Sequence, residues 1–171
     1  MNEERTQSQV GKMSRRKGKQ FEREIAKFFT EWTDVKWETT RNSGRTDLIG
    51  DIYMPSKPLF PMVVECKHRR NFTVHAMIKP TKAFQDMLDA VQAKWLNEAK
   101  RSILVIIIKN ETGVWATARA SSSSHKKITF ETIGRPGTVI IAGMYRWYEL
   151  KDLYTDDYCG IRFKKMGGLA T

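Results

Sequence analysis

The segment ILVIIIK, residues 103–109, constrains the fold most strongly, because it opens with six consecutive apolar residues, most of them β-branched. A run of this length and composition predicts a buried strand, and we place it near the centre of a sheet. It is far too short to span a bilayer, so we expect no association with a membrane. Further strands are expected over residues 35–40, 48–54, 59–67, 114–118, 128–133 and 138–147.

Two amphipathic helices are expected beside these strands. The first covers residues 14–32, with Ser14 as a candidate N-cap, and the second covers residues 81–100. The large apolar residues of the first helix recur at helical spacing on one face: Phe21, Ile25, Phe28 and Trp32. The order of helix, three strands, helix and further strands predicts an α/β (α+β) domain with a central mixed β-sheet flanked by helices. We expect a disordered N-terminal segment at residues 1–13 and a single domain at residues 14–171.

The chain is strongly basic, with 30 lysines and arginines against 19 acidic residues, a net charge of +11. Such an excess favours a polyanionic partner, with nucleic acid as the first candidate, although solvated surface lysines would also produce it. Cys66 and Cys159 form neither a disulfide framework nor a zinc pattern, which is typical of a reducing compartment.

Two charged residues, Glu65 and Lys67, interrupt the apolar strand at residues 59–67. Side chains two positions apart in a strand point to the same face, and burying them is costly unless they are paired or used. Asp51 lies on the expected partner strand of a hairpin, where two carboxylates can share a cation such as Mg²⁺. Lys67 beside such a cation could orient or deprotonate water, or neutralise charge on a scissile phosphate. A buried Glu65–Lys67 salt bridge is the alternative, but it leaves Asp51 unexplained.

Two other acids bear on this group. Glu22 lies beside Phe21 at the edge of the first helix's apolar face, from which it could reach the same carboxylates. The alternative is that Glu22 is an ordinary solvated surface residue. Asp47 competes with Asp51, and we favour Asp51 because it lies within the apolar strand.

Three segments together, KGKQFEREIAKFF, RNSGRTDLIGDIY and VVECKHRR, resemble the PD-(D/E)xK nucleases, specifically the archaeal and phage-type Holliday junction resolvases. The resemblance covers residues 14 to 108, and it depends on weak motifs that occur in the family's order. It implies a restriction-endonuclease-like fold and Mg²⁺ (or Mn²⁺) as cofactor. The catalytic residues that it implies are Glu22, Asp51, Glu65 and Lys67. The metal ligands would be Glu22, Asp51, Glu65 and the backbone carbonyl of Cys66. Gly50 departs from the family, which often has proline there.

Basic and polar residues around these motifs are expected to contact DNA. They are Arg15, Arg16, Lys17, Lys19, Arg41, Ser43, Arg45, His68, Arg69 and Arg70, of which Ser43 resembles a residue that contacts the cleaved strand. The resemblance therefore implies a metal-dependent, structure-selective DNA endonuclease, a Holliday junction resolvase that hydrolyses branched DNA as a homodimer.

Two alternatives stay open: a general or restriction-like nuclease of the same fold, and a catalytically inactive DNA-binding protein. We expect a cytoplasmic protein, in the host cytoplasm if it is phage-encoded. Beyond residue 108 nothing specific is similar to the family. The apolar and aromatic segment 138–147 is either a dimer interface or a core or edge strand.

Overall fold

The computed structural model describes residues 7–40, 50–58, 60–98, 103–120, 140–142, 145–149 and 162. Its elements in chain order are α1 (Gln7–Thr33), β1 (Glu38–Thr39), β2 (Ile52–Tyr53), β3 (Met62–His68), α2 (Val74–Ile78), α3 (Lys82–Glu98), β4 (Ile103–Lys109), β5 (Val114–Ala120), β6 (Ile140–Ala142) and β7 (Tyr145–Glu149). The strands follow the order β1-β2-β3-β4-β5-β7-β6 across the sheet. Only β3 and β4 pair in parallel, whereas every other described pair is antiparallel, so the predicted mixed sheet flanked by helices is confirmed.

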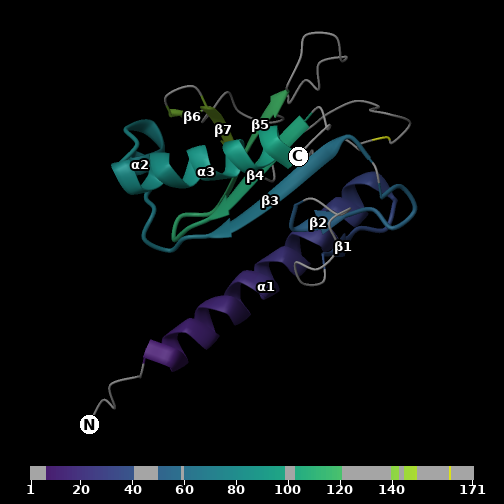
Figure 1. Ribbon diagram of the computed structural model, residues 1–171, viewed down its shortest axis with the longest axis horizontal. Coiled ribbons are helices and arrows are strands. Elements are labelled where there is room, and N and C mark those ends of the chain that lie inside the picture. Colours follow the sequence, from purple (N-terminus) through teal and green to yellow (C-terminus); the bar gives the residue numbers. More distant parts are fainter. Residues whose placement is uncertain are drawn as a thin grey trace, which may run out of the picture.

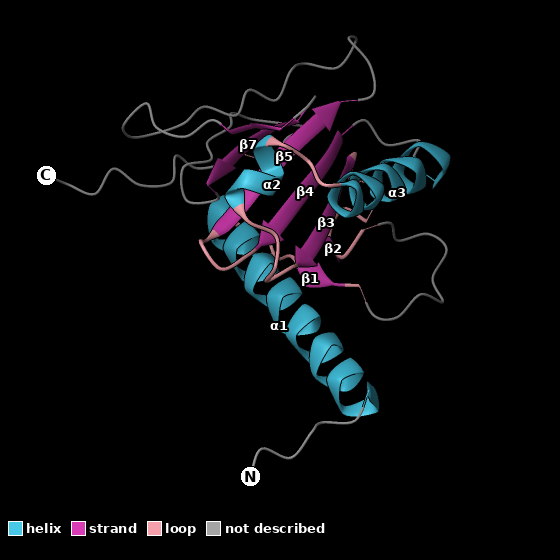
Figure 2. Ribbon diagram, turned by 90° about the vertical axis from the view of Figure 1, so that its left-hand side faces the viewer, coloured by secondary structure: helices cyan, strands magenta, loops and turns pink. Residues whose placement is uncertain are grey.

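The helices cover both faces of the sheet (Figures 1 and 2). The parallel β3–β4 pair requires a crossover connection, and the chain makes it through α2 and α3 on one face, while α1 packs on the other. Because both faces are covered, β3 and β4 bury side chains in both directions, which is why these strands read as almost continuous apolar runs. The predicted strand at residues 103–109 therefore lies in the middle of the sheet, between β3 and β5.

Two hydrophobic clusters form the core, one on each face. On the α1 side, the helix buries large side chains against alternate residues of β3 and β4: Phe21, Ile25, Phe29 and Trp32 against Val64, Cys66, Val105 and Ile107. On the α3 side, Phe84 and Leu88 pack against the intervening residues Val63, Leu104 and Ile106. This alternation fixes which residues of β3 point towards each helix.

Helix α1 differs from its prediction at both its start and its buried face. It begins at Gln7, so Ser14 lies inside the helix and is not the N-cap, and residues 7–13, expected to be disordered, are helical. The prediction followed the apolar face, which begins only at Phe21, whereas the first turns lie beyond the sheet (Figure 2). Phe29 rather than Phe28 is the fully buried residue, and Phe28 packs against the core from a partly buried position.

Two further elements differ from the sequence prediction. The short helix α2 follows Thr73, whose Oγ1 accepts a hydrogen bond from the Ala76 N–H at 3.2 Å, and it was not predicted. The single strand expected over residues 138–147 is instead the antiparallel pair β6 and β7. The strand expected over residues 128–133 lies outside the described residues.

Candidate active site

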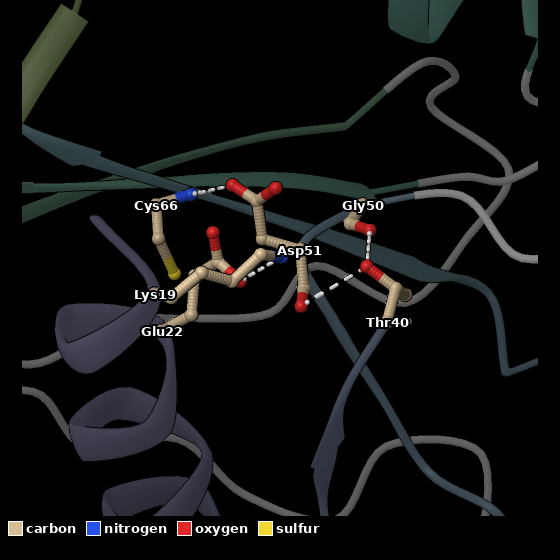
Figure 3. Close-up of polar contacts among 6 residues, drawn as sticks. All are labelled: Lys19, Glu22, Thr40, Gly50, Asp51 and Cys66. Carbon is tan, nitrogen blue, oxygen red and sulfur yellow. Dashed lines mark hydrogen bonds and ion pairs between the residues drawn. The ribbon is translucent and has the colours of Figure 1, made fainter. Parts of the chain in front are cut away.

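The hairpin of β2 and β3 places Asp51 beside Cys66. β2 runs antiparallel to β3 with Ile52 opposite Val64, and the Asp51 N–H donates to the Val64 carbonyl at 2.8 Å. The Asp51 side chain continues along the edge of β3, where its Oδ2 accepts a hydrogen bond from the Cys66 N–H at 2.7 Å (Figure 3). The proximity of Asp51 to the Glu65–Lys67 segment, predicted from a hairpin, is therefore present in the structure.

Two residues, Gly50 and Thr40, hold the backbone of Asp51 in place. Neither was predicted from the sequence to have this role. Gly50 has a φ of +94°, and a Cβ there would lie 2.8 Å from the Val64 carbonyl oxygen, so only glycine fits without strain. The Thr40 N–H donates to the Asp51 carbonyl at 3.0 Å, and the Thr40 hydroxyl lies 3.0 Å from the Gly50 carbonyl oxygen (Figure 3). The glycine directly before Asp51 was a sequence signal for this close approach, whereas Thr40 gave none.

Glu65 and Lys67 lie on the same face of β3, as predicted. Val64 and Cys66 belong to the core beneath α1, so the alternating residues Glu65 and Lys67 point to the opposite face. Glu65 is buried, at 6% exposed, and the Lys67 ammonium forms an ion pair with its Oε1. The Glu65–Lys67 salt bridge, the alternative considered in the sequence analysis, is thus present. It lies close enough to Asp51 that the Asp51 carboxylate interacts electrostatically with both Glu65 and Lys67.

Glu22 approaches Asp51 from α1, on the opposite face of the sheet from the side chains of Glu65 and Lys67. It is buried, at 9% exposed, and not a solvated surface residue, because it lies on the helix face that packs against the sheet. Its Oε2 accepts a hydrogen bond from Lys19 Nζ at 2.7 Å, and Figure 3 shows this pair beside Asp51 and Cys66. Lys19, which was predicted to contact DNA, is therefore paired with a carboxylate of the cluster.

The buried position of Asp51 makes its ionisation unfavourable. Burial, and secondly the charge of Glu65, raise the pKa of Asp51 from an ordinary 3.8 to about 6, although the Cys66 N–H and Lys67 counteract the rise. Burial also raises the pKa of the Cys66 thiol well above its usual range, so the thiol remains a protonated core group, as the sequence suggested. The charges of Glu65 and, more weakly, of Glu22 thus both act on the buried Asp51 carboxyl group.

The backbone of Cys66 offers a further oxygen. In an extended strand the N–H and the carbonyl of one residue point to the same edge, and the Cys66 N–H points towards Asp51. The Cys66 carbonyl therefore faces the same edge of β3, past the end of β2. A sequence resemblance alone had suggested this carbonyl, and the strand geometry now gives it a physical basis.

The chemistry of these donors fits a hard divalent cation. Carboxylate and carbonyl oxygens are the ligands that Mg²⁺ accepts, and a cation would relieve the mutual repulsion that raises the pKa of Asp51. Within the described ranges, no three histidine, cysteine or acidic side chains are already gathered as one metal-ligating group. Two of the three carboxylates instead hold lysines, Glu22 with Lys19 and Glu65 with Lys67.

Apart from Lys19, the predicted DNA-contacting residues fall into three sets. Arg15, Arg16 and Lys17 lie on α1, in the turns that precede Glu22. His68 ends β3, and Arg69 and Arg70 follow it. The remaining predicted contacts, Arg41, Ser43 and Arg45, and the competing acid Asp47, lie outside the described residues.

Comparison with known proteins places the chain in a family. Residues 13–136 match the model of the family described as "Phage putative PDDEXK endonuclease", which is well over half of the chain. No curated protein and no solved structure matches the chain. Among the described helices, none has the length and apolar character needed to cross a membrane. The predicted resemblance to PD-(D/E)xK nucleases is confirmed at the level of the superfamily, and the chain belongs to the phage PDDEXK endonuclease family.

Proposed function

We propose that this chain is a DNA endonuclease that depends on Mg²⁺ or Mn²⁺ and uses Glu22, Asp51, Glu65 and Lys67 as its catalytic group. The observation that carries the proposal is the position of the buried Asp51 carboxylate, which accepts the Cys66 N–H at 2.7 Å beside the Glu65–Lys67 ion pair. Burial and the charge of Glu65 accordingly raise the pKa of Asp51 to about 6. Buried like charges of this kind mark functional sites more often than structural ones. A protein without catalysis would gain stability by losing this charge, which argues against an inactive DNA-binding protein.

The residues divide the work by position. Asp51, whose carboxylate lies beside Cys66 at the open edge of β3, would hold the cation together with Glu65 and the Cys66 carbonyl, and Glu22 would complete the site from α1. The bound cation supplies positive charge to the scissile phosphate and a more acidic water. Lys67, which pairs with Glu65 in the structure, would lose this partner if Glu65 held the cation. Its ammonium can then hydrogen bond the attacking water or neutralise charge that develops on the phosphate.

The central experiment combines site variants with a DNA-binding measurement. We expect Asp51→Asn, Glu65→Gln and Lys67→Met each to lower the cleavage rate by at least about 10²-fold, because each removes a group that acts on water or charge. Affinity for DNA in EDTA should change little, because binding depends on phosphate contacts spread over the basic surface. Asp86→Asn, which alters an exposed carboxylate on α3, is the matched control. A variant that cleaves at the wild-type rate would remove its residue from the catalytic group, and three active variants would refute the proposal.

Within this activity we further propose selectivity for four-way or other branched DNA, cut by a homodimer. Its support is the similarity of the motifs to those of Holliday junction resolvases, together with symmetry, since a two-fold dimer presents two sites to two related strands. A general nuclease fits the family equally well. Light scattering of the free protein, with competition between a four-way junction and linear duplex, separates the two. A monomer with equal affinity for both DNAs would leave the nuclease standing and refute the resolvase.

A further inference from the structure

A groove runs between the first half of α1 and the end of β3. It consists of two cavities, of about 410 and 470 Å³, that share Met13, Lys17 and His68 in their walls. The first extends towards Lys109 at the end of β4, and the second extends along the residues that follow β3, as far as Phe72. We call the two cavities together the α1 groove.

The rim of the α1 groove is cationic. Arg16, Lys17 and Arg69 line it, and none of them forms an ion pair with another residue that the structure describes. The further basic residues in the walls are neutralised, since Lys109 pairs with Glu24 at 2.7 Å and Arg70 pairs with Glu111 at 3.0 Å. An uncompensated positive rim calls for a polyanion rather than a neutral or cationic partner.

Apolar side chains lie between these charges. Val10 and Met13 are 53% and 38% exposed, and they are the large apolar side chains that stand out to solvent within the described ranges. Both lie in the first two turns of α1, whose N-terminal part reaches past the sheet (Figure 2), and the partly buried Phe72 lies in the same wall. Apolar surface exposed in a groove with a charged rim indicates a ligand that has both an apolar and an anionic part.

We propose that the α1 groove binds an unpaired DNA strand, with phosphates at Arg16, Lys17 and Arg69 and bases against Val10, Met13 and Phe72. Duplex DNA presents phosphates but hides the faces of its bases in the stack, so it would leave the apolar wall uncovered. An unpaired strand exposes both, and bases on apolar or aromatic side chains with cations along the backbone are the general mode of single-strand binding. This inference extends the proposed nuclease function and depends on it for its biological purpose.

The groove adjoins the candidate active site at two points. Phe21, in the wall of the groove, directly precedes Glu22 in α1. His68, also in the wall, directly follows Lys67 in β3. The Phe21 and His68 rings lie 6.0 Å apart, so these two points are also neighbours in space. A strand held in the groove would therefore lead towards Glu22, the carboxylate on the α1 side of the sheet. The preferred substrate would carry a single-stranded branch or end next to the cleaved bond.

The test compares two DNA shapes with one apolar variant. Fluorescence anisotropy in EDTA would measure the affinity of the full chain for a labelled oligothymidine and for a duplex of equal length. The variant Val10→Ser/Met13→Ser changes only exposed residues. It should bind the oligothymidine about tenfold more weakly, with less than a twofold change for the duplex. The control Ala83→Ser/Ala90→Ser makes two equally exposed substitutions on α3 and should change neither affinity. No loss, or an equal loss for both DNAs, would overturn the proposal.

A second measurement needs no variant. An oligonucleotide containing 5-iododeoxyuridine, irradiated on the wild-type protein, should give cross-links at residues 10–17 or 68–72, and adducts confined to other segments would overturn the proposal. A change in oligomeric state of the Ser variant would also overturn it, because the groove would then hold a second copy of the chain. Cleavage of plasmid DNA by the wild type with Mg²⁺ reports the nuclease separately, so its presence or absence distinguishes failure of the groove from failure of the proposed function.

Discussion

Replacing Asp51 with asparagine should stabilise the folded protein in the absence of metal while it abolishes cleavage. In the wild type, Asp51 Oδ2 accepts the Cys66 N–H at 2.7 Å. The asparagine amide keeps an oxygen that can accept the same hydrogen bond, but it carries no charge. The cost that it removes follows from the pKa of Asp51, which rises from 3.8 to about 6 on folding. At about 1.36 kcal/mol per pKa unit, this rise corresponds to about 3 kcal/mol of lost stability when the carboxylate is ionised.

The sign of the effect fixes its dependence on pH. Below the unfolded pKa of 3.8 the carboxyl group is protonated in both states, so aspartate and asparagine should differ little. As the pH rises towards 6, the unfolded chain loses this proton before the folded protein does, and the wild type loses stability relative to the variant. The advantage of Asp51→Asn in free energy of unfolding should grow from about 0.6 kcal/mol near pH 4 to about 3 kcal/mol near pH 8.

Urea unfolding followed by tryptophan fluorescence, in EDTA across this pH range, would measure the difference. Asp86→Asn, on the exposed side of α3, should change stability by no more than about 0.5 kcal/mol at any pH. A variant at Asp51 that is less stable than the wild type near pH 8, or whose effect does not vary with pH, would refute the electrostatic reasoning. In that case the carboxylate would be stabilised by its surroundings, as a structural ion pair would be.

Two further predictions concern residues that hold the Asp51 backbone, and a third concerns the basic residues of α1. Gly50→Ala should destabilise the protein by about 2–4 kcal/mol in urea unfolding, because it combines a positive φ with a contact against Val64, and it should slow cleavage without removing a catalytic atom. Thr40→Val should cost about 1 kcal/mol in the same assay, and Thr40→Ser should restore the loss, since only the hydroxyl contacts the Gly50 carbonyl. Changing residues 15–17 to alanine should flatten the dependence of log affinity on log salt by up to about 0.9 for each lost phosphate contact, and an unchanged slope would place the contacts elsewhere.

The elements that were predicted correctly are those whose own residues carry a recognisable pattern. β4 and α3 follow directly from a β-branched run and from helical periodicity, and the β2–β3 hairpin follows from two strands on either side of a short proline-containing turn. Asp51 and Glu65 were found together because the hairpin brings them into register, which needs no long-range information. The helix face left Glu22 open between a surface residue and a member of the site, and the family resemblance favoured the site, where burial against the sheet now places it beside Asp51.

The missed features depend on exposed or very short segments. The first turns of α1 have no apolar face to predict from, and α2, with its five residues, is too short for a periodic pattern. The mainly apolar and aromatic composition of residues 138–147 conceals the reversal between β6 and β7, because it continues from one strand into the next. The pairing of Lys19 with Glu22 does have a local signal, since residues three apart are neighbours on a helix, but the same lysine also fits the basic surface expected to contact DNA.

The shortness of β2 explains how the sheet can present a polar site at all. β3 has seven residues, but β2 has only two and pairs with β3 at Val64. Past that point the edge of β3 faces the Asp51 side chain, which takes the Cys66 N–H in place of a strand carbonyl. A longer β2 would satisfy this edge with backbone and exclude both the carboxylate and any ligand of the Cys66 carbonyl. On the other edge, β4 pairs with β3 over its whole length, so the catalytic candidates Glu65 and Lys67 stay rigid. The same strand is therefore fixed on one edge and open on the other, and the candidate site lies at the open edge.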